Sequence, residues 1–273
     1  MPEGPEIRRA ADVVAKYIEH QVVKKIYFAH EHLKNFEKTL LGLKVIKVST
    51  RGKAMLCHFD NGLSIYSHNQ LYGRWYCLEH GQQIETKRSL RLSITTTKGV
   101  AQLYSASDIG VLNSQEIKLH PLLSRMGPDV LDSQLTSSDI IQRLNLKKFK
   151  FRQLGQILTD QAFIAGIGNY LRCEILFICG LHPKVKALDC SKNKLKQLAR
   201  KIIDLPRQSY IHQGITNNLV SAQKMMDNGV SFEQARFYVF RREDLSCYRC
   251  QTAIVKTNTG QACFLCPECQ SID

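Results

Sequence analysis

The chain has 273 residues, a length that favours two compact domains with room for a small further module. Thirty-eight lysines and arginines against 24 acidic residues give a net charge of +14, which favours a polyanionic partner. Nucleic acid ranks above an anionic membrane surface, because no lysine-rich amphipathic helix with bulky aromatic residues stands out. No apolar run could cross a bilayer and no secretory signal opens the chain, so we expect a cytoplasmic protein without disulfides.

The first part of the sequence predicts one helix followed by β structure. Apolar residues recur at helical spacing from about Glu6 to Glu19, which indicates an amphipathic helix. From Val22 to about Leu112, β-branched and polar residues alternate between turn signals, which predicts a mainly antiparallel β domain. Turn and capping residues then gather between Gly127 and Asp139, where we place a domain boundary.

Beyond this boundary the pattern is helical and then becomes irregular. Apolar residues at spacings of three and four predict helices near 140–144, 151–158, 170–179 and 192–203. The last sixty or so residues contain a polar segment at 213–228, a predicted strand at 237–240 and a cysteine cluster. We therefore expect an α+β protein with domains at 1–126, 127–228 and 229–273.

Four of the ten cysteines have the spacing of a structural zinc site. Cys247 and Cys250 are separated by two residues, as are Cys266 and Cys269, and fifteen residues lie between the pairs. Two such pairs supply four tetrahedral thiolates, and the spacer has room for a β-hairpin. Cys263 and Cys266 offer a second choice for the later pair. We prefer Cys266 with Cys269, because Pro267 shapes the turn between them. The other cysteines are interpreted as small core residues.

A zinc site with four protein ligands leaves no open position for chemistry, so the reactive group lies elsewhere. Removal of Met1 would give Pro2 a free secondary amine, which is partly neutral and nucleophilic near pH 7. Its attack on a sugar aldehyde carbon would form an iminium ion, the electron sink that elimination requires. Glu3 could act as a general acid toward the sugar ring oxygen. The alternative is a plain helix entry, with Pro5 and Glu6 in the first turn.

Several motifs, and their order along the chain, resemble those of the formamidopyrimidine-DNA glycosylase and endonuclease VIII family. These motifs are Pro2–Glu6, Lys53 after Arg51-Gly52, the loop Gly166–Tyr170 and the four-cysteine hairpin. Ser67–Gly73 is similar to the bacterial endonuclease VIII branch, which excises oxidised pyrimidines. The resemblance covers essentially the whole chain.

This resemblance implies both a fold and an activity. The fold would be an N-terminal helix on a β-sandwich, a helix-two-turn-helix domain and a zinc-bearing hairpin, with damaged double-stranded DNA bound between the two domains by a monomer. Pro2 would attack the anomeric carbon, Glu3 would assist sugar opening, and Lys53 would act as a general acid or contact a phosphate. Without the resemblance, Lys53 would be one solvated lysine among many.

The resemblance also assigns residues that contact DNA. Gln70, Arg125 and Asn169 match positions that contact DNA, and Asn169 ends a glycine loop at a helix entry, which suits anion binding. Gln70, Leu71 and Tyr72 would fill the gap left when the damaged base flips out. The alternative for Leu71 and Tyr72 is packing in the β core.

Gln261 departs from the family pattern. It stands five residues before the third cysteine ligand, where the family normally has an arginine that grips phosphates and supports δ-elimination. Glutamine lacks the permanent charge and the five-donor fork of arginine. We expect Gln261 to contact DNA weakly and the products to shift toward β-elimination.

Two further functions compete with the bifunctional glycosylase and lyase. One is a non-catalytic relative that binds lesions or distorted duplex, which retention of Met1 would produce. The other is a zinc-ribbon scaffold that binds RNA or protein. Covalent trapping on an abasic site separates the enzyme from both.

Overall fold

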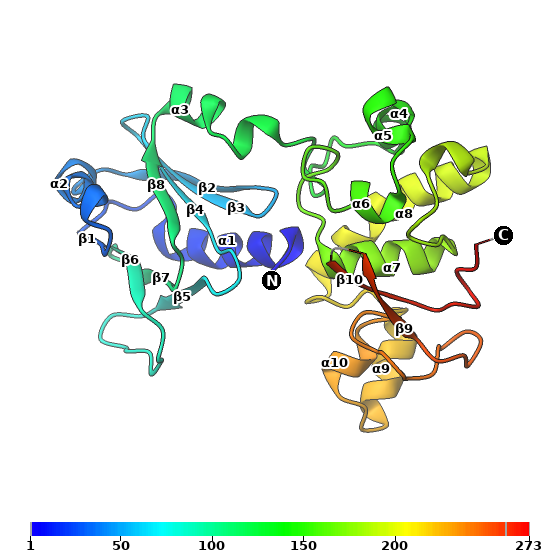
Figure 1. Ribbon diagram of the computed structural model, residues 1–273. Coiled ribbons are helices and arrows are strands. Elements are labelled where there is room, and N and C mark those ends of the chain that lie inside the picture. Colours follow the sequence, from blue (N-terminus) through cyan, green and yellow to red (C-terminus); the bar gives the residue numbers. More distant parts are fainter. Residues whose placement is uncertain (1, 260, 273) are drawn as a thin grey trace. The chain divides into compact units, whose positions relative to one another are not determined.

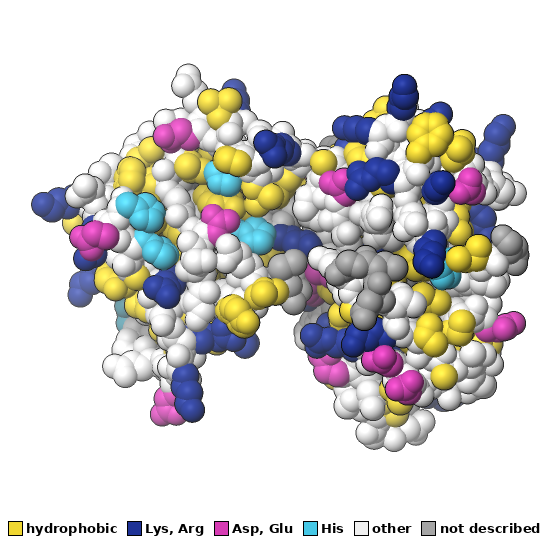
Figure 2. All heavy atoms as spheres, viewed as in Figure 1, with side chains coloured by type: hydrophobic (Ala, Val, Ile, Leu, Met, Phe, Trp, Pro, Cys, Tyr) yellow, Lys and Arg dark blue, Asp and Glu magenta, His cyan; other side chains and the backbone are white. Residues whose placement is uncertain are grey.

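The computed structural model describes residues 2–259 and 261–272, with the backbone alone at 258 and 259. Two compact units divide the chain between Arg125 and Met126, and each unit is considered by itself. No helix in the described residues is both long and apolar enough to pass through a bilayer. Lysine and arginine side chains are visible on both units in Figure 2, in keeping with the excess of positive charge. The further limit that we place at 228/229 stays a prediction.

The first unit is a β-sandwich with a helix at its start (Figure 1). One antiparallel sheet has the order β1-β6-β7-β5, and the other has the order β2-β3-β4-β8. The strands are β1 (Lys25–Phe28), β2 (Val45–Arg51), β3 (Ala54–Phe59), β4 (Ser64–His68), β5 (Arg74–Leu78), β6 (Leu90–Thr95), β7 (Val100–Tyr104) and β8 (Asp108–Leu112). The helical elements are α1 (Gly4–Ile18), η1 (Glu31–Leu33), α2 (Asn35–Leu40), α3 (Ser114–Leu119) and η2 (Leu123–Arg125).

Helix α1 and both sheets share one hydrophobic core. Ala11, Val14 and Ile18 of the apolar stripe on α1 pack in the same cluster as Ile94 from one sheet and Ile65 from the other. The spacing of this stripe predicted the helix, and its burial now fixes the position of the amino end. The sequence missed η1 and α2, because each is too short to show a clear helical period.

The second unit is helical and carries one hairpin. Its elements are α4 (Ser137–Asn145), α5 (Lys147–Lys150), α6 (Leu154–Ile157), α7 (Asn169–Cys179), η3 (Ala187–Asp189), α8 (Lys192–Ile211), α9 (Leu219–Asp227), α10 (Phe232–Ala235), β9 (Val255–Thr259) and β10 (Gln261–Leu265). Strands β9 and β10 pair antiparallel, and β10 contacts α7 (Figure 1). Helix α8 continues past the predicted end at 203, with Pro206 inside it. The polar segment expected at 213–228 contains α9.

The strand predicted at 237–240 is wrong. The backbone N–H groups of Tyr238, Val239 and Phe240 all donate to the carboxylate of Glu174, at 2.7, 2.8 and 3.0 Å. Successive N–H groups in a strand point to opposite sides, so a turn is needed for three of them to reach one carboxylate. The aromatic and β-branched residues that suggested a strand are instead used for packing, as Phe237 is buried in the helical core.

Glu174 is fully buried on α7, and Thr216 Oγ1 also donates to it at 2.7 Å. Burial raises the pKa of this carboxyl group, while the hydrogen bonds that it accepts lower the pKa and so favour the charged form. Glu174 therefore anchors the segment that leads to the hairpin onto the helical core.

Replacing Glu174 by glutamine should destabilise the second unit by about 2–4 kcal/mol, because an amide nitrogen cannot accept these hydrogen bonds. The denaturation midpoint, followed by a probe in the second unit, measures this effect. Glu233→Gln is the matched control, since the Glu233 side chain is 63% exposed and should change stability by less than about 0.5 kcal/mol. An unchanged midpoint for Glu174→Gln would contradict the anchoring role.

Candidate active site and metal centre

Two carboxylates organise the amino end of α1. Glu3 is the N-cap residue and is only 2% exposed, and its backbone N–H donates to Glu6 Oε2 at 3.0 Å. Glu6 also accepts from Arg9 at 2.8 Å through its other oxygen. These contacts form a capping box, so the helix-entry interpretation of this segment is correct as far as local structure goes. A capping role does not by itself explain the burial of Glu3, since capping carboxylates are commonly solvated.

Lys53 follows Gly52 in the turn between β2 and β3, where Gly52 has a φ of 59°. The lysine is 7% exposed, so it is not a solvated lysine. Burial lowers the pKa of its amine, and the negative charges of Glu3 and Glu6 oppose this shift. The structure therefore brings Lys53 into the field of both carboxylates at the start of α1.

Pro2 opens onto a hollow in the first unit. The hollow has a volume of about 380 Å³, and its wall includes Pro2, Glu6, Arg9, Asn69, Leu71 and Tyr72. Pro2 itself is half-buried. The start of α1 and the loop between β4 and β5 thus share one solvent-accessible space, although they are far apart in the sequence.

The loop between β4 and β5 presents two apolar side chains to solvent. Leu71 is 62% exposed and Tyr72 is 70% exposed, so packing in the β core is wrong for both residues. Gln70 has a φ of 49°, and its side chain accepts a hydrogen bond from Ser107 at 2.7 Å. At Gly73, an added Cβ would lie 2.6 Å from the carbonyl oxygen of Asn69, so this tight turn requires glycine.

His68 is a site residue that the sequence did not single out. Burial lowers the pKa of its imidazole, Asp108 raises it, and Lys53 lowers it, so the ring lies in the same charge cluster as Lys53. The reason is strand register, because Ala54, next to Lys53, pairs with His68. Asp108 also accepts from the Tyr66 hydroxyl at 3.0 Å. The alternation of residues predicted strands here, but it does not specify which residues are partners.

Asn169 and Gln261 are neighbours in the second unit. Asn169 begins α7, and its amide nitrogen donates to the carbonyl oxygen of Ala262 at 2.8 Å. Gln261 is exposed one residue earlier in β10. Buried Arg172, which the sequence did not single out, donates to the same Ala262 oxygen at 3.0 Å and to Asn169 Oδ1. Arg125 is exposed at the end of η2 in the first unit and is not part of the wall of the 380 Å³ hollow.

The four predicted cysteine ligands form a cluster. Their sulfur atoms all lie within 4.8 Å of one another, with distances of 3.4 Å for Cys250–Cys266, 3.5 Å for Cys250–Cys269 and 3.9 Å for Cys247–Cys269. Four sulfurs bound at about 2.3 Å to one zinc ion would be about 3.8 Å apart, so the arrangement fits such an ion. Hydrogen bonds from Thr252 lower the pKa of Cys250 to about 6, which favours the thiolate form needed for metal binding.

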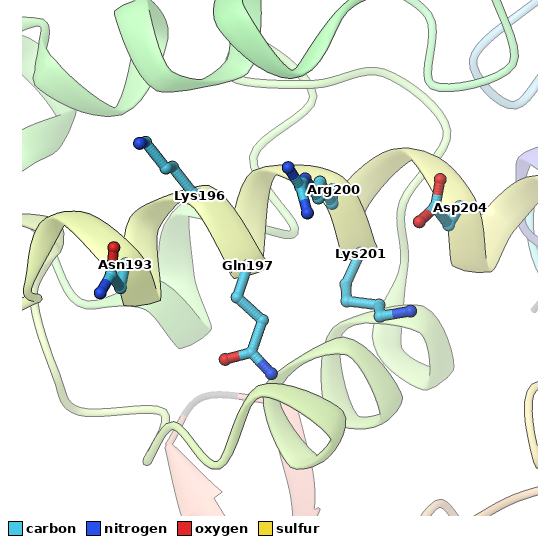
Figure 3. A pocket seen from close by; sticks show the side chains of 6 residues that line it. All are labelled: Asn193, Lys196, Gln197, Arg200, Lys201 and Asp204. Atoms are coloured by element: carbon cyan, nitrogen blue, oxygen red, sulfur yellow. The ribbon is translucent and has the colours of Figure 1, made fainter.

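Another hollow lies along α8 and contains none of the predicted site residues (Figure 3). Its volume is about 510 Å³, and it is lined by Asn193, Lys196, Gln197, Arg200, Lys201 and Asp204. In Figure 3, Lys196 and Arg200 point to one side of the helix, and Gln197 and Lys201 point to the other. Three cations and one carboxylate make it weakly basic, but its lining has no nucleophile or metal ligand set.

Comparisons with known proteins cover nearly the whole chain. The formamidopyrimidine-DNA glycosylase N-terminal domain matches residues 1–106, and the formamidopyrimidine-DNA glycosylase H2TH domain matches residues 126–221. Endonuclease 8 of Salmonella arizonae is 44% identical over 271 residues, which cover 99% of this chain and 100% of the relative. Endonuclease 8 of Enterobacter sp. strain 638 is 43% identical over the same shares of the two chains.

Solved structures show the same fold. A structure of MutM in complex with DNA containing carbocyclic 8-oxo-G has a TM-score of 0.79 at 20% identity. A complex between Lactococcus lactis Fpg (MutM) and DNA containing an oxidised pyrimidine has a TM-score of 0.81 at 18% identity. Each comparison covers 99% of this chain and 100% of the other chain.

Replacing Cys250 by serine should lower the bound metal from about one ion per chain to near zero, because three thiolates hold a structural ion far more weakly than four. Elemental analysis of the purified protein measures this. Cys190→Ser is the control, since Cys190 lies outside the four-sulfur cluster. A Cys250→Ser protein with full metal content would rule out this cluster as the metal centre.

Proposed function

Because the chain belongs to the formamidopyrimidine-DNA glycosylase and endonuclease VIII family, whose members are DNA glycosylases and abasic-site lyases of base-excision repair, we propose that it excises oxidised pyrimidines through a covalent bond to Pro2. The choice of oxidised pyrimidines follows the high identity to proteins called endonuclease 8. The observation that carries the proposal is the burial of Glu3 and Lys53 in one charge cluster at the end of the helix that Pro2 precedes.

Pro2 acts as the nucleophile once its nitrogen is a free secondary amine. An α-amino group has a pKa near 7.7–8.0, so about a tenth or more is neutral at pH 7. The nitrogen attacks the anomeric carbon of the damaged nucleotide, the bond to the base breaks, and the sugar remains attached as an iminium ion. This cation accepts the electron pair released when a proton leaves C2′, and the bond to the 3′ phosphate then breaks by β-elimination.

Glu3 and Lys53 move protons around this reaction. Glu3 donates to the sugar ring oxygen as the ring opens, a role that suits a carboxyl group held out of water. Lys53 acts as a general acid or contacts a phosphate. Its lowered pKa supports the first role, because an ammonium with a lowered pKa gives up its proton more readily.

Gln70, Leu71 and Tyr72 fill the space that the flipped nucleotide leaves. A base that is turned out of the stack leaves a gap, and apolar side chains inserted there recover part of the lost stacking. The exposure of Leu71 and Tyr72 supports this role, because these side chains otherwise contact water at a cost. The hydrogen bond between Gln70 and Ser107 holds the base of the loop.

Arg125, Asn169 and Gln261 contact the DNA backbone in this proposal. Arg125 and Gln261 are both exposed and so are accessible to phosphates, and Asn169 lies at the amino end of α7, where N–H groups favour an anion. The four cysteines hold a structural zinc ion, which supplies no reactive position and keeps β9 and β10 in place beside α7. We also propose that the protein acts as a monomer on double-stranded DNA in the bacterial cytoplasm.

Borohydride should trap a covalent adduct between the protein and an abasic-site duplex, because it reduces the iminium ion to a stable amine. The protein is first verified by mass to begin at Pro2, and the adduct is measured by gel shift and peptide mapping. The matched control carries one extra residue before Pro2, which converts the secondary amine into an amide. Binding without an adduct for the verified protein would instead indicate a non-catalytic lesion-binding relative.

The ends of the cleaved strand test the role of Gln261. We expect the natural chain to give mainly β-elimination ends. Gln261→Arg should raise the share of β,δ-elimination ends severalfold, because arginine adds a charged, bidentate contact to phosphate. Gel separation of the 3′ ends measures both products. Gln223→Arg adds the same charge on α9 and should leave the ratio unchanged. Complete double elimination by the natural chain would contradict the proposed effect of glutamine at this position.

A further inference from the structure

Two cysteines outside the four-sulfur cluster face each other in the second unit. The sulfur of Cys173 on α7 lies 3.8 Å from the sulfur of Cys263 on β10. Both residues are buried in the cluster that joins the hairpin to α7. The sequence left Cys173 as a core residue and offered Cys263 as a possible partner of Cys266. In the structure, Cys263 instead pairs with Cys173.

These sulfurs lie at the contact between β10 and α7. This joint also carries the proposed DNA contacts of Asn169 and Gln261. Asn169 and Arg172 both donate to the carbonyl oxygen of Ala262, the residue between Gln261 and Cys263. On the other side of Cys263, the backbone N–H of Phe264 donates to Cys173 Sγ at 3.4 Å. A change in the distance between the two sulfurs therefore moves the strand next to Gln261 relative to the amino end of α7.

We propose that Cys173 and Cys263 form a peroxide-responsive dithiol. Its oxidation to a disulfide lowers the affinity of the protein for DNA. A disulfide bond is about 2.05 Å long, so the sulfurs must approach by less than 2 Å, which side-chain rotation and a small strand shift can supply. The four metal ligands are held by their own cluster, so they are separate from this reaction.

The reaction needs a peroxide as oxidant. The Cys263 thiolate attacks one peroxide oxygen, the O–O bond breaks, and a sulfenic acid and hydroxide form. The Cys173 thiol then attacks the sulfenic sulfur, and its proton leaves with the displaced hydroxide as water. The hydroxide from the first step takes up the proton that Cys263 lost on forming the thiolate. Overall, two thiols and one hydrogen peroxide give one disulfide and two waters, and a cellular dithiol reverses the reaction by exchange.

The surroundings favour Cys263 as the attacking sulfur. A hydrogen bond from Cys173 and the positive charge of Arg172 lower the pKa of Cys263, and burial opposes them. Burial raises the pKa of Cys173, which keeps that sulfur protonated until the second step. Because both sulfurs are buried, the oxidant enters during local opening of the joint, so a small peroxide reacts faster than a bulky disulfide.

The effect on DNA rests on the proposed contacts of Asn169 and Gln261. With both thiols reduced, the Asn169 and Arg172 side chains meet Ala262 at 2.8 and 3.0 Å. Pulling β10 toward α7 disturbs this fit and displaces the neighbouring Gln261. We expect the affinity for an abasic-site duplex to fall about tenfold on oxidation, the equivalent of one good hydrogen bond.

The first test maps the disulfide without using DNA. The purified protein, with its metal content measured, is treated with hydrogen peroxide, unfolded, alkylated and digested for mass spectrometry. We expect a peptide that links Cys173 to Cys263, a mass loss of about 2 Da that dithiothreitol reverses, and full metal retention. Cys190→Ser should keep the link, and Cys173→Ser should lose it. The map of the natural chain stands even if Cys173→Ser folds poorly.

Full alkylation of both cysteines after treatment would overturn the proposal. So would metal loss with disulfides among the four cluster cysteines in place of the expected link.

The second test compares the affinity of the reduced and oxidised protein for an abasic-site duplex. A mapped disulfide that leaves this affinity unchanged would overturn the regulatory effect. Because the mapping needs neither DNA nor Pro2, its result is independent of borohydride trapping, which tests the proposed function.

Discussion

The carboxylate of Glu174 is shared by three backbone N–H groups and the Thr216 hydroxyl, and the second unit depends on this shared acceptor. A buried carboxylate is costly unless every oxygen is well solvated by donors, so its charge forces the chain to bend around it. The hairpin packs against the same helix that carries Glu174. Glu174 thus ties the segment 238–240 to the helix against which the hairpin packs.

The first unit uses buried charge differently. Lys53 and Glu3 are buried, Glu6 is partly exposed beside them, and the two negative charges reduce the cost of burying the Lys53 ammonium. Burial lowers the pKa of the Lys53 amine, and the neighbouring carboxylates limit this decrease. Proton transfer benefits from groups of this kind, and perturbed pKa values are common at functional sites. The same charges would contribute little at the surface, where solvent screens them.

The cysteines of the second unit show how the position of a thiol decides its chemistry. Four of them converge on a common point, where a metal ion can hold all four as thiolates. Cys173 and Cys263 face each other away from that point and have each other as the sulfur partner. Both groups lie in the single apolar cluster that joins the hairpin to α7. Metal binding and thiol oxidation would therefore act on the same joint through separate atoms.

Local patterns in the sequence were enough for several features. The spacing of the four cysteines predicted their cluster, since two residues between thiols already set a ligand-forming turn. The apolar period of α1 predicted the helix, and the order of motifs indicated the family and the residues around Pro2. These features depend on residues that are close together along the chain, or on a motif that is distinctive by itself.

The tertiary structure decided whatever depended on distant partners. The segment 237–240 has the composition of a strand, but Glu174, more than sixty residues away, makes it a turn. Leu71 and Tyr72 are apolar enough for a core, yet the tight loop held by Asn69 and Gly73 turns them to solvent. The proximity of His68 to Lys53 and of Cys173 to Cys263 follows from strand register and helix packing. A sequence pattern specifies periodicity and composition, whereas register and packing are fixed by the lowest free energy of the whole unit.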